Sequence, residues 1–270
     1  MTATLTAPAP VTTAGRVTTA GIVASEWTKF RSLRSSWWTL GTAVLLIVGF
    51  GALIAATSEE GGSDSFTSPA ELTSFLLLGV IFAQLATAIL GVLMISGEYG
   101  TGMIRTSMTA VPKRLPVLGA KAAVYTAVVL PLTLVASFVT FFLGQAIRSS
   151  RGLETITLGD TGVLREVIGS SLYVTVAGLI ALGIGTLLRH TAAGLATVVG
   201  IFFVVPIVAN FLPTSINGFA PYLPSNAGGA LWGLSMSNES MAPWTGFALL
   251  VGYAAVLLVA AGVRLRRTDV

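Results

Sequence analysis

Apolar residues along the chain gather in six long runs, separated by shorter segments that are rich in glycine, proline and charged residues. Each run is close to the ~20 residues that an α-helix needs to cross a bilayer. We therefore predict an all-α, polytopic membrane protein with one transmembrane domain over residues 21–270. Its six spans are expected at residues 38–56, 75–95, 122–143, 167–188, 193–211 and 244–263.

The composition refines this prediction by excluding other classes. Of the 270 residues, 54% are hydrophobic and 10% are charged, whereas soluble domains carry about 25% charged residues. The chain has no cysteine and one histidine, His190, so disulfides, thiolate sites and paired-histidine metal sites are excluded. The net charge of +4 comes from basic residues beside the predicted spans. We therefore expect a lipid bilayer around the chain, no nucleic-acid partner, and no metal or cofactor bound by it.

The basic residues are distributed unequally between the two sides of the predicted bundle. Twelve of the fifteen lie in the N-terminal segment, in the loops after the second and fourth spans, or at the C-terminus. The other side holds only Arg148, Arg151 and Arg165. By the positive-inside rule, both termini are cytoplasmic. Residues 1–20 lack the apolar core of a signal peptide and are predicted to form a disordered cytoplasmic tail.

The predicted spans contain no Asp, Glu, Lys or Arg. Ion-coupled transporters usually place ionisable groups near the midplane, and intramembrane enzymes need a catalytic set, so the sequence disfavours both classes. It also lacks the Gly-Lys-Ser/Thr of a P-loop, so energy for uphill transport would have to come from another chain. Two uncharged polar residues, Gln84 and Asn210, either bond between helices or line a substrate path.

Small residues recur at four-residue intervals on several spans, and such ladders let helix backbones approach closely. The ladders are Ala83/Thr87/Gly91, Ala177/Ala181/Gly185 and Ala196/Gly200. We predict that they are helix-packing faces. Pro131 and Pro206 lie inside the third and fifth spans and are predicted to kink them.

Residues 21–37, before the first span, carry an apolar stripe with helical spacing. Its members are Val23, Trp27, Phe30, Leu33 and Trp37. Glu26, Lys29 and Arg31 lie away from the stripe, and Arg34 flanks it. Aromatic residues opposite basic ones are typical of a helix that lies in the membrane interface. This elbow helix is either a passive anchor of the first span or a lever that also touches a cytoplasmic partner.

The loop at residues 97–115 joins the second and third spans on the predicted cytoplasmic side. Gly97, Gly100 and Gly102 allow a sharp turn, Thr101 can cap a short helix, and Pro112 should end it. The helix would cover about residues 102–110 and present Met103, Ile104, Arg105 and Met108. Methionines suit a surface that repacks against a partner, although the pattern alone also fits an ordinary positive-inside loop.

The sequence of this loop resembles a known family. Glu98-Tyr99-Gly100-Thr101-Gly102-Met103-Ile104-Arg105, followed by Ala110-Val111-Pro112-Lys113-Arg114, is similar to the signature of bacterial ABC-2 type transporter permeases. The stretch from Ser25 to Arg34 resembles the same family, as do the six spans and the terminal Arg-Arg-x-Asp at residues 266–269. In one departure, Met103 stands where a hydroxyl residue is expected.

The resemblance implies a role for each element. Residues 97–115 would hold a coupling helix that docks on a separate ATPase subunit, which itself binds ATP and magnesium. Glu98 would brace that helix through Arg105 or a base of the elbow helix. The residues implied in coupling are Glu98, Tyr99, Gly100, Thr101, Gly102, Met103, Ile104, Arg105 and Met108, and those of the elbow helix are Glu26, Trp27, Lys29, Phe30, Arg31 and Arg34.

The function that follows is that of a non-enzymatic permease subunit in a bacterial cytoplasmic membrane. It would export an amphipathic or hydrophobic solute and assemble with two ATPase copies and a second permease. The alternative is a membrane-bound immunity or binding protein that has the same scaffold and does not transport.

The last loop, residues 212–243, is predicted to be extracellular and yet contains many apolar residues. A helix at about residues 226–234 would be ~13 Å long, which is too short to span. It suits a re-entrant helix in the outer leaflet, which the family resemblance also implies. Two interpretations stay open here: an apolar plug on the helix ends, or a lid over the exit path.

Overall fold

The computed structural model describes residues 18–58, 68–100, 102–103, 115–213, 217–235 and 241–267. The regular secondary structure of the described residues is helical, with no strand among them. Most of the predicted N-terminal tail and most of the predicted coupling helix lie outside these residues.

Six helical segments are long and apolar enough to cross a membrane, and each contains most of one predicted span. They are α2 (Arg34–Thr57), α4 (Gly79–Gly100), α6 (Leu115–Ser150), α7 (Val163–Leu188), the segment Thr191–Asn210, and α11 (Pro243–Arg267). The remaining elements are shorter: α1 (Thr19–Ser32), α3 (Pro69–Leu76) and α10 (Pro224–Gly229), with 3₁₀ turns at Ala220–Tyr222 and Ala230–Trp232. The prediction of a six-helix membrane protein is thus confirmed.

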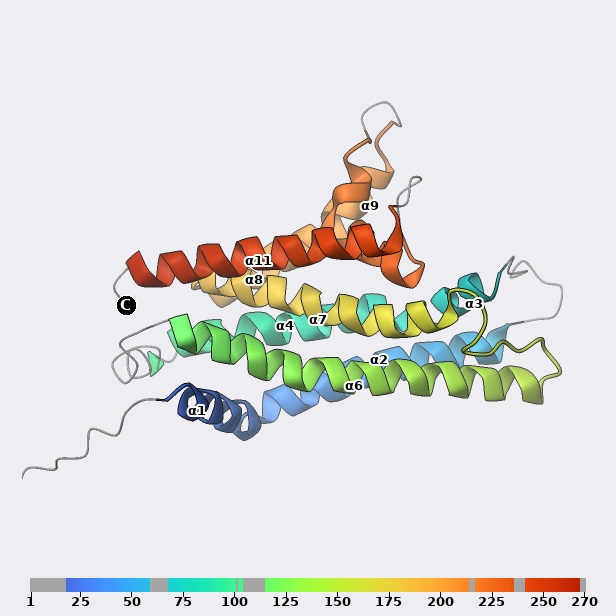
Figure 1. The fold of residues 1–270 in the computed structure, drawn as a ribbon, viewed down its shortest axis with the longest axis horizontal. Coiled ribbons are helices and arrows are strands. Elements are labelled where there is room, and N and C mark those ends of the chain that lie inside the picture. The colour runs from blue at the N-terminus through green and yellow to red at the C-terminus, as the bar shows by residue number, and fades with distance from the viewer. Residues whose placement is uncertain are drawn as a thin grey trace, which may run out of the picture.

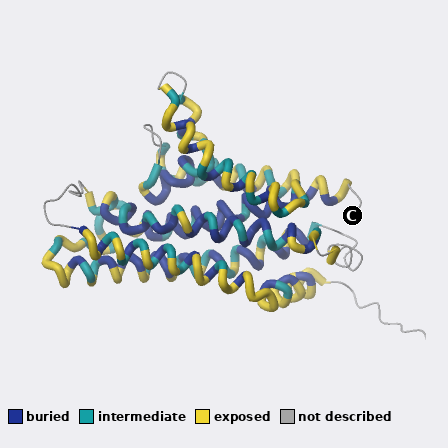
Figure 2. Tube along the Cα trace, turned by 180° about the vertical axis from the view of Figure 1, so that it is seen from behind, coloured by how far each residue is buried: buried dark blue, intermediate teal, exposed yellow. Residues whose placement is uncertain are grey.

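The helices form three layers, with α4 and α7 in the middle (Figure 1). One outer layer contains α2 and α6, and the other contains α8 (Thr191–Val199) and α11. Buried residues concentrate along the middle layer, and the outward faces are exposed (Figure 2). α1 and the end of α11 lie at one end of the bundle, and α3 lies at the other. We call these the α1 end and the α3 end.

Small residues explain how closely α4 and α7 approach each other. A Cβ atom added to Gly91 would lie only 2.4 Å from the carbonyl oxygen of Gly178. A Cβ atom on Gly178 would lie 1.6 Å from Oη of Tyr125, which donates a hydrogen bond to the Thr87 carbonyl at 3.1 Å. The predicted packing faces of the second and fourth spans are therefore confirmed.

The fifth span differs from its prediction in two ways. Ala196 is exposed and Gly200 has no atom near an added Cβ, so the predicted ladder is not a packing face among the described residues. A π-helical turn at Gly200–Val204 then precedes α9 (Val205–Asn210), which projects away from the bundle (Figure 1). Because Pro206 has no N–H, it cannot continue the α-helical bonds, and the turn accommodates it. The predicted bend at Pro206 is confirmed. α6 is one continuous helix across Pro131, and the predicted kink there stays a prediction.

Two other helices differ in extent from the predicted spans. The second span was predicted from residue 75, but residues 75–76 belong to α3, and α4 starts at Gly79. A Cβ atom at Gly79 would meet the α2 backbone at 2.2 Å, so this glycine lets α4 start tightly against α2. The third span was predicted at residues 122–143, but α6 has 36 residues and is about 54 Å long. It therefore exceeds the ~30 Å hydrocarbon core.

The short helix predicted in the last loop is present at the α3 end. α10 and the following 3₁₀ turn cover residues 224–232 and pack against α7 and α11. Leu231 and Trp232 are almost fully buried there. This packing favours the plug interpretation over the lid.

Candidate functional site

α1 is shorter than the predicted elbow helix. Thr18 caps its N-terminus by accepting a hydrogen bond from the Gly21 N–H, and the helix ends at Ser32. Leu33 is extended, and α2 begins directly after it at Arg34. The helix boundary at residue 37 was therefore wrong, since Arg34 and Trp37 belong to the first span helix.

α1 also turns a different face to the bundle than its apolar stripe suggested. Ile22, Glu26 and Phe30 are buried, whereas Val23 and Trp27 are exposed. Glu26, predicted to lie on a polar outer face, is only 3% exposed. The physical reason is an ammonium group inside the bundle that compensates its charge. The exposed apolar residues of α1 remain available to lipid.

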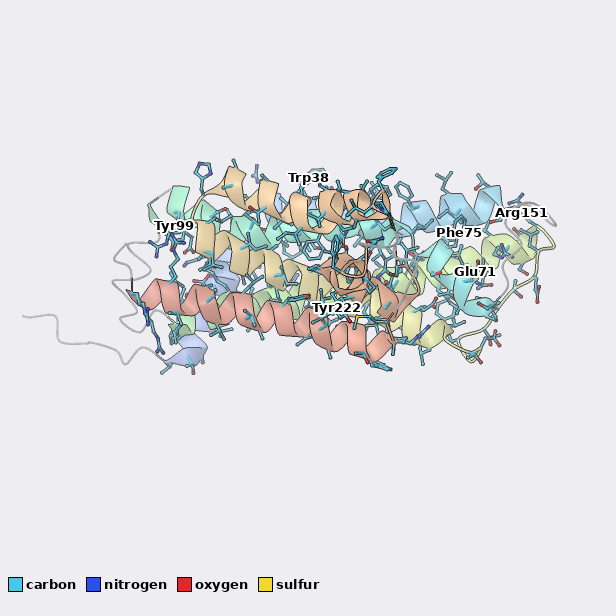
Figure 3. The ribbon with its side chains drawn as sticks, turned by 90° about the horizontal axis from the view of Figure 1, so that it is seen from above. Trp38, Glu71, Phe75, Tyr99, Arg151 and Tyr222 are labelled. Atoms are coloured by element: carbon cyan, nitrogen blue, oxygen red, sulfur yellow. The ribbon has the colours of Figure 1, made fainter. Side chains whose placement is uncertain are left out.

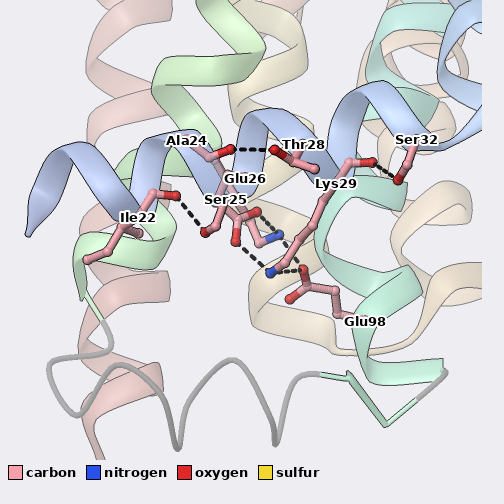
Figure 4. A network of polar contacts seen from close by, with 9 residues as sticks. Ile22, Ala24, Ser25, Glu26, Thr28, Lys29, Ser32 and Glu98 are labelled. Atoms are coloured by element: carbon pink, nitrogen blue, oxygen red, sulfur yellow. Dashed lines mark hydrogen bonds and ion pairs between the residues drawn. The ribbon is translucent and has the colours of Figure 1, made fainter. Parts of the chain in front are cut away.

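Four charged residues from three helices form a closed cluster at the α1 end (Figure 4). Nζ of Lys121, on α6, lies 2.6 Å from Oε2 of Glu26 and 2.8 Å from Oε1 of Glu98. Nζ of Lys29 lies 2.7 Å from Oε1 of Glu26 and 2.9 Å from Oε1 of Glu98. Glu26 and Lys29 come from α1, and Glu98 comes from the last turn of α4. Each carboxylate therefore contacts both ammonium groups.

Three of the four side chains are buried and that of Lys29 is 28% exposed, so the buried charges depend on one another. Lys121 is 2% exposed and Glu98 is 5% exposed. Removing one partner from a buried ion pair leaves an uncompensated charge, which typically costs about 3–5 kcal/mol. At Lys29, burial alone would lower the pKa, but the hydrogen bonds and charges of Glu26 and Glu98 outweigh it and raise the pKa above 10.5. The cluster thus ties α1, α4 and α6 together.

A second set of contacts holds α4 from the side of α7 and α8. The Arg189 guanidinium lies 5.4 Å from the centre of the Tyr99 ring, a cation–π distance. Arg189 ends α7 in a left-handed conformation, with φ at 57°. His190 then caps α8 by accepting from the Ala193 N–H at 3.2 Å, and the Thr191 hydroxyl donates to Ser96 at 3.0 Å. The last turns of α4 are therefore fixed by four surrounding helices.

The predicted turn after this point lies later than expected. α4 stays helical through Gly97 and Gly100, and the turn that these glycines and Gly102 were expected to allow comes at Gly102. Gly102, with φ at +71°, makes the turn, and its N–H bonds to the Tyr99 carbonyl at 3.3 Å. Met103 is 44% exposed. Thr101, Ile104, Arg105 and Met108 lie outside the described residues.

A cavity of about 240 Å³ adjoins the charge cluster between α1, α2 and α4. Its polar wall includes Glu98 together with Ser35 and Ser36 from the first turn of α2. Its apolar wall consists of Phe30, Leu33, Leu90, Leu93, Met94 and Met103. Oε2 of Glu98 is buried and has no hydrogen-bond partner, unlike Oε1. The cavity thus combines an apolar surface with the side chain of a buried glutamate.

The two residues predicted for a substrate path are not brought together. Gln84 is buried in α4 and accepts a hydrogen bond from the Tyr173 hydroxyl of α7. It lines a small cavity of about 40 Å³ beside Trp232, whose indole nitrogen is buried without a partner. Asn210 is exposed at the end of the projecting α9. The interhelical hydrogen bond is therefore found for Gln84, and the substrate path stays a prediction.

Sequence reasoning missed the central residue of the charge cluster. Lys121 was assigned to the loop before the third span, because the apolar run that defines this span begins at residue 122. Leu118 and Tyr125, three residues before and four after it, are both buried on the same helix. Extending the helical period backwards from the span would have placed Lys121 on the inner face. Glu166, likewise assigned to a loop, is buried in α7 near Gly233.

The charge cluster lies at the α1 end of the molecule. Charged residues of the loops on the opposite side of the bundle lie at the α3 end. In Figure 3, Tyr99 lies at the α1 end, and Glu71 and Arg151 lie at the α3 end. The chain is thus a polytopic helical membrane protein with a polar, tightly held site at the α1 end. Neither protein-family models nor curated proteins match the chain.

Proposed function

We propose that the chain is the membrane-spanning permease subunit of an ABC-2 type exporter, working with a separate ATPase. One observation carries the proposal. The last turn of α4, where the family-like segment begins at Glu98, is bonded to Lys29 of α1 and to Lys121 of α6. A segment that receives force from a partner must be coupled rigidly to the helices it moves. The resemblance alone suggested an elbow base as the partner of Glu98, and Lys29 is such a base.

In this proposal, α1 is the elbow helix and the α1 end is cytoplasmic. An ATPase subunit grips residues 97–115 and pushes on α4. The cluster passes the displacement to α1 and α6, and the contact between Arg189 and Tyr99 passes it to the hairpin of α7 and α8. Two permeases and two ATPases form the complex, and ATP and magnesium are bound by the ATPases.

The transported solute is an amphipathic or hydrophobic molecule, and the membrane is the cytoplasmic membrane of a bacterium. Supporting this class of solute, the inner surface of the bundle is largely apolar, with isolated hydroxyl and amide groups. The Gln84–Tyr173 pair, which joins α4 to α7, is one such pair of groups.

The test is co-expression of this chain with a candidate ABC ATPase subunit. We expect copurification and ATPase stimulation, both reduced at least tenfold by Arg105→Ala in the predicted coupling helix. Glu98→Ala should reduce stimulation as well. Glu154→Ala is the matched control, because Glu154 is an exposed carboxylate of the loop at the α3 end. Equal binding and stimulation by all variants would reject the coupling role.

The alternative function, a membrane-bound immunity or binding protein, predicts a different outcome of the same experiment. The ATPase complex would form, but vesicles would show no ATP-dependent efflux of any amphiphile tested. The tight packing of the plug at Leu231 and Trp232 is the observation that favours a static scaffold.

A further inference from the structure

The cavity beside the charge cluster is lined by both acidic and basic side chains. Glu98, which is 5% exposed, lines the cavity, and its Oε2 is buried without a hydrogen-bond partner. Ser35 and Ser36 on the same wall belong to the first turn of α2. This 24-residue helix has no side-chain cap at its N-terminus. The amide of Ser36 bonds to the Leu33 carbonyl at 3.2 Å. The helix dipole and the other first-turn amides make such a terminus favourable for an anion. The cavity therefore offers a place for a cation and a place for an anion.

The charge balance of the site determines which ligand it suits. The two carboxylates and two ammonium groups of the cluster sum to zero. A cationic ligand would leave an unbalanced charge beside Lys29 and Lys121, and an anionic ligand would do the same beside Glu26 and Glu98. Unbalanced buried charges are costly. A zwitterion keeps the site neutral and uses both walls.

The surroundings of the cavity place it at the level of lipid headgroups. Trp27, Trp37 and Trp38 are exposed around the junction of α1 and α2, and tryptophan is enriched at membrane–water interfaces. The apolar wall from Leu90 to Met94 continues into the part of α4 that is long and apolar enough to span. A molecule held here would have its polar end at the cluster and its apolar end toward the bilayer. The volume of about 240 Å³ is well above the roughly 10–15 Å³ that one water needs.

We propose that this cavity binds a membrane phospholipid whose headgroup carries a primary ammonium. The ammonium donates to Oε2 of Glu98, and the phosphate lies at the N-terminus of α2. The first methylenes of the acyl chains contact Leu90, Leu93 and Met94. The lipid then stabilises the seam between α1 and α4. This inference requires only the membrane location of the α1 end and is independent of any ATPase partner.

The test uses the purified full chain in detergent, with native mass spectrometry to measure bound lipid. The probes are phosphatidylethanolamine, phosphatidylcholine and phosphatidylglycerol with identical acyl chains. Phosphatidylcholine keeps the zwitterion but has no N–H donor, and phosphatidylglycerol has no ammonium. We expect phosphatidylethanolamine to bind about tenfold more tightly than either, as for one charge-assisted hydrogen bond. Equal binding of the three lipids would overturn the proposal.

Two variants test the lipid-binding site separately from the folding of the chain. Glu98→Gln removes the negative charge and should abolish the preference for phosphatidylethanolamine over phosphatidylcholine. Gly97→Leu fills the cavity, because Gly97 lines it and an added Cβ there meets no atom within 4 Å. It should reduce binding of phosphatidylethanolamine at least tenfold. Gly49→Leu is the matched control, since Gly49 is also a helical glycine with open space around it, away from the cavity.

One further comparison distinguishes a lipid from a soluble ligand with the same headgroup. Free phosphoethanolamine should fail to displace phosphatidylethanolamine at equal concentration, because it lacks the apolar end. Displacement at equal concentration would assign the site to a soluble zwitterion and overturn the lipid. Unchanged lipid binding in Gly97→Leu would place the lipid elsewhere and overturn the cavity as the site.

Discussion

At the scale of single residues, Lys121 is the position on which the α1 end depends most. Its ammonium is 2% exposed and contacts the carboxylates of Glu26 and Glu98. In Lys121→Met, both carboxylates would rely on Lys29 alone. We expect a loss of about 3–5 kcal/mol in the free energy of unfolding, measured by denaturant titration in detergent micelles.

The control variants for Lys121→Met distinguish the effect of the lost charge on stability from the effect of the changed side-chain shape. Arg31→Met removes an exposed basic residue of α1 and should change the free energy of unfolding by less than about 0.5 kcal/mol. The triple variant Glu26→Gln/Glu98→Gln/Lys121→Met neutralises the buried charges together and should recover most of the loss. A loss of the same size in the triple variant would show that shape, rather than charge, determines the effect.

Lys29 gives the cluster a defined dependence on pH. The bonds to Glu26 and Glu98 raise its pKa above 10.5 despite burial. A raised pKa in the folded state means that the stabilisation is complete below 10.5 and is lost as the pH rises through the folded-state value. The distance between spin labels at Thr28→Cys and Gly119→Cys, in a chain without native cysteine, should therefore stay constant up to pH 10.5 and increase above it.

Lys29→Met tests whether this dependence belongs to Lys29. In that variant the label distance should no longer change at high pH. A change that begins well below pH 10.5, or one that persists in Lys29→Met, would assign the opening of α1 to another group.

At the scale of elements, the seam between α4 and α7 tolerates no side chain at its closest point. In Gly91→Ala the new Cβ would lie 2.4 Å from a backbone oxygen of α7, so the helices must separate. We expect a loss of about 1–3 kcal/mol, as for an overpacked core, measured as unfolding in detergent. Gly41→Ala is the control, because its added Cβ meets nothing within 4 Å. Equal stability of the two variants would contradict the close approach.

The elements show which features the sequence could predict and why others were beyond it. Hydropathy predicted the six spans, because a run of about 20 apolar residues in a bilayer satisfies its backbone hydrogen bonds by forming a helix. The face of α1 was not predictable from its own residues, since Glu26 is buried only because Lys121 lies opposite it, 95 residues further on. The projection of α9 depends on a π-helical turn that local propensity does not encode. For the candidate site, the sequence indicated Glu98 and Lys29 but missed Lys121.

At the scale of the whole molecule, the decisive feature is that the four-residue charge cluster lies at the α1 end. The cluster, the end of α4 and the end of α11 share the α1 end (Figure 1), whereas α10 and the 3₁₀ turn after it pack against α7 and α11. An ATPase can act on this molecule only if the α1 end is cytoplasmic. Orientation is therefore the property that the proposed function requires first.

The chain offers a clean measurement of orientation because it has no cysteine. Ser32 and Ser150 are a matched pair: both are exposed at helix ends, and each hydroxyl donates to the carbonyl three residues earlier, at 2.8 and 2.7 Å. They lie at the α1 end and the α3 end, respectively. A membrane-impermeant maleimide applied to intact cells should label Ser150→Cys and leave Ser32→Cys unlabelled until the membrane is permeabilised.

Equal labelling of both variants in detergent would show that each cysteine is reactive, so that a difference on intact cells reports sidedness alone. The positive-inside distribution, twelve basic residues against three, is the physical reason to expect this result. The opposite pattern would place Glu98 and the segment after it outside the cell, where ATP does not drive transport. The permease proposal would then fail, whereas the lipid site would remain and would move to the outer leaflet.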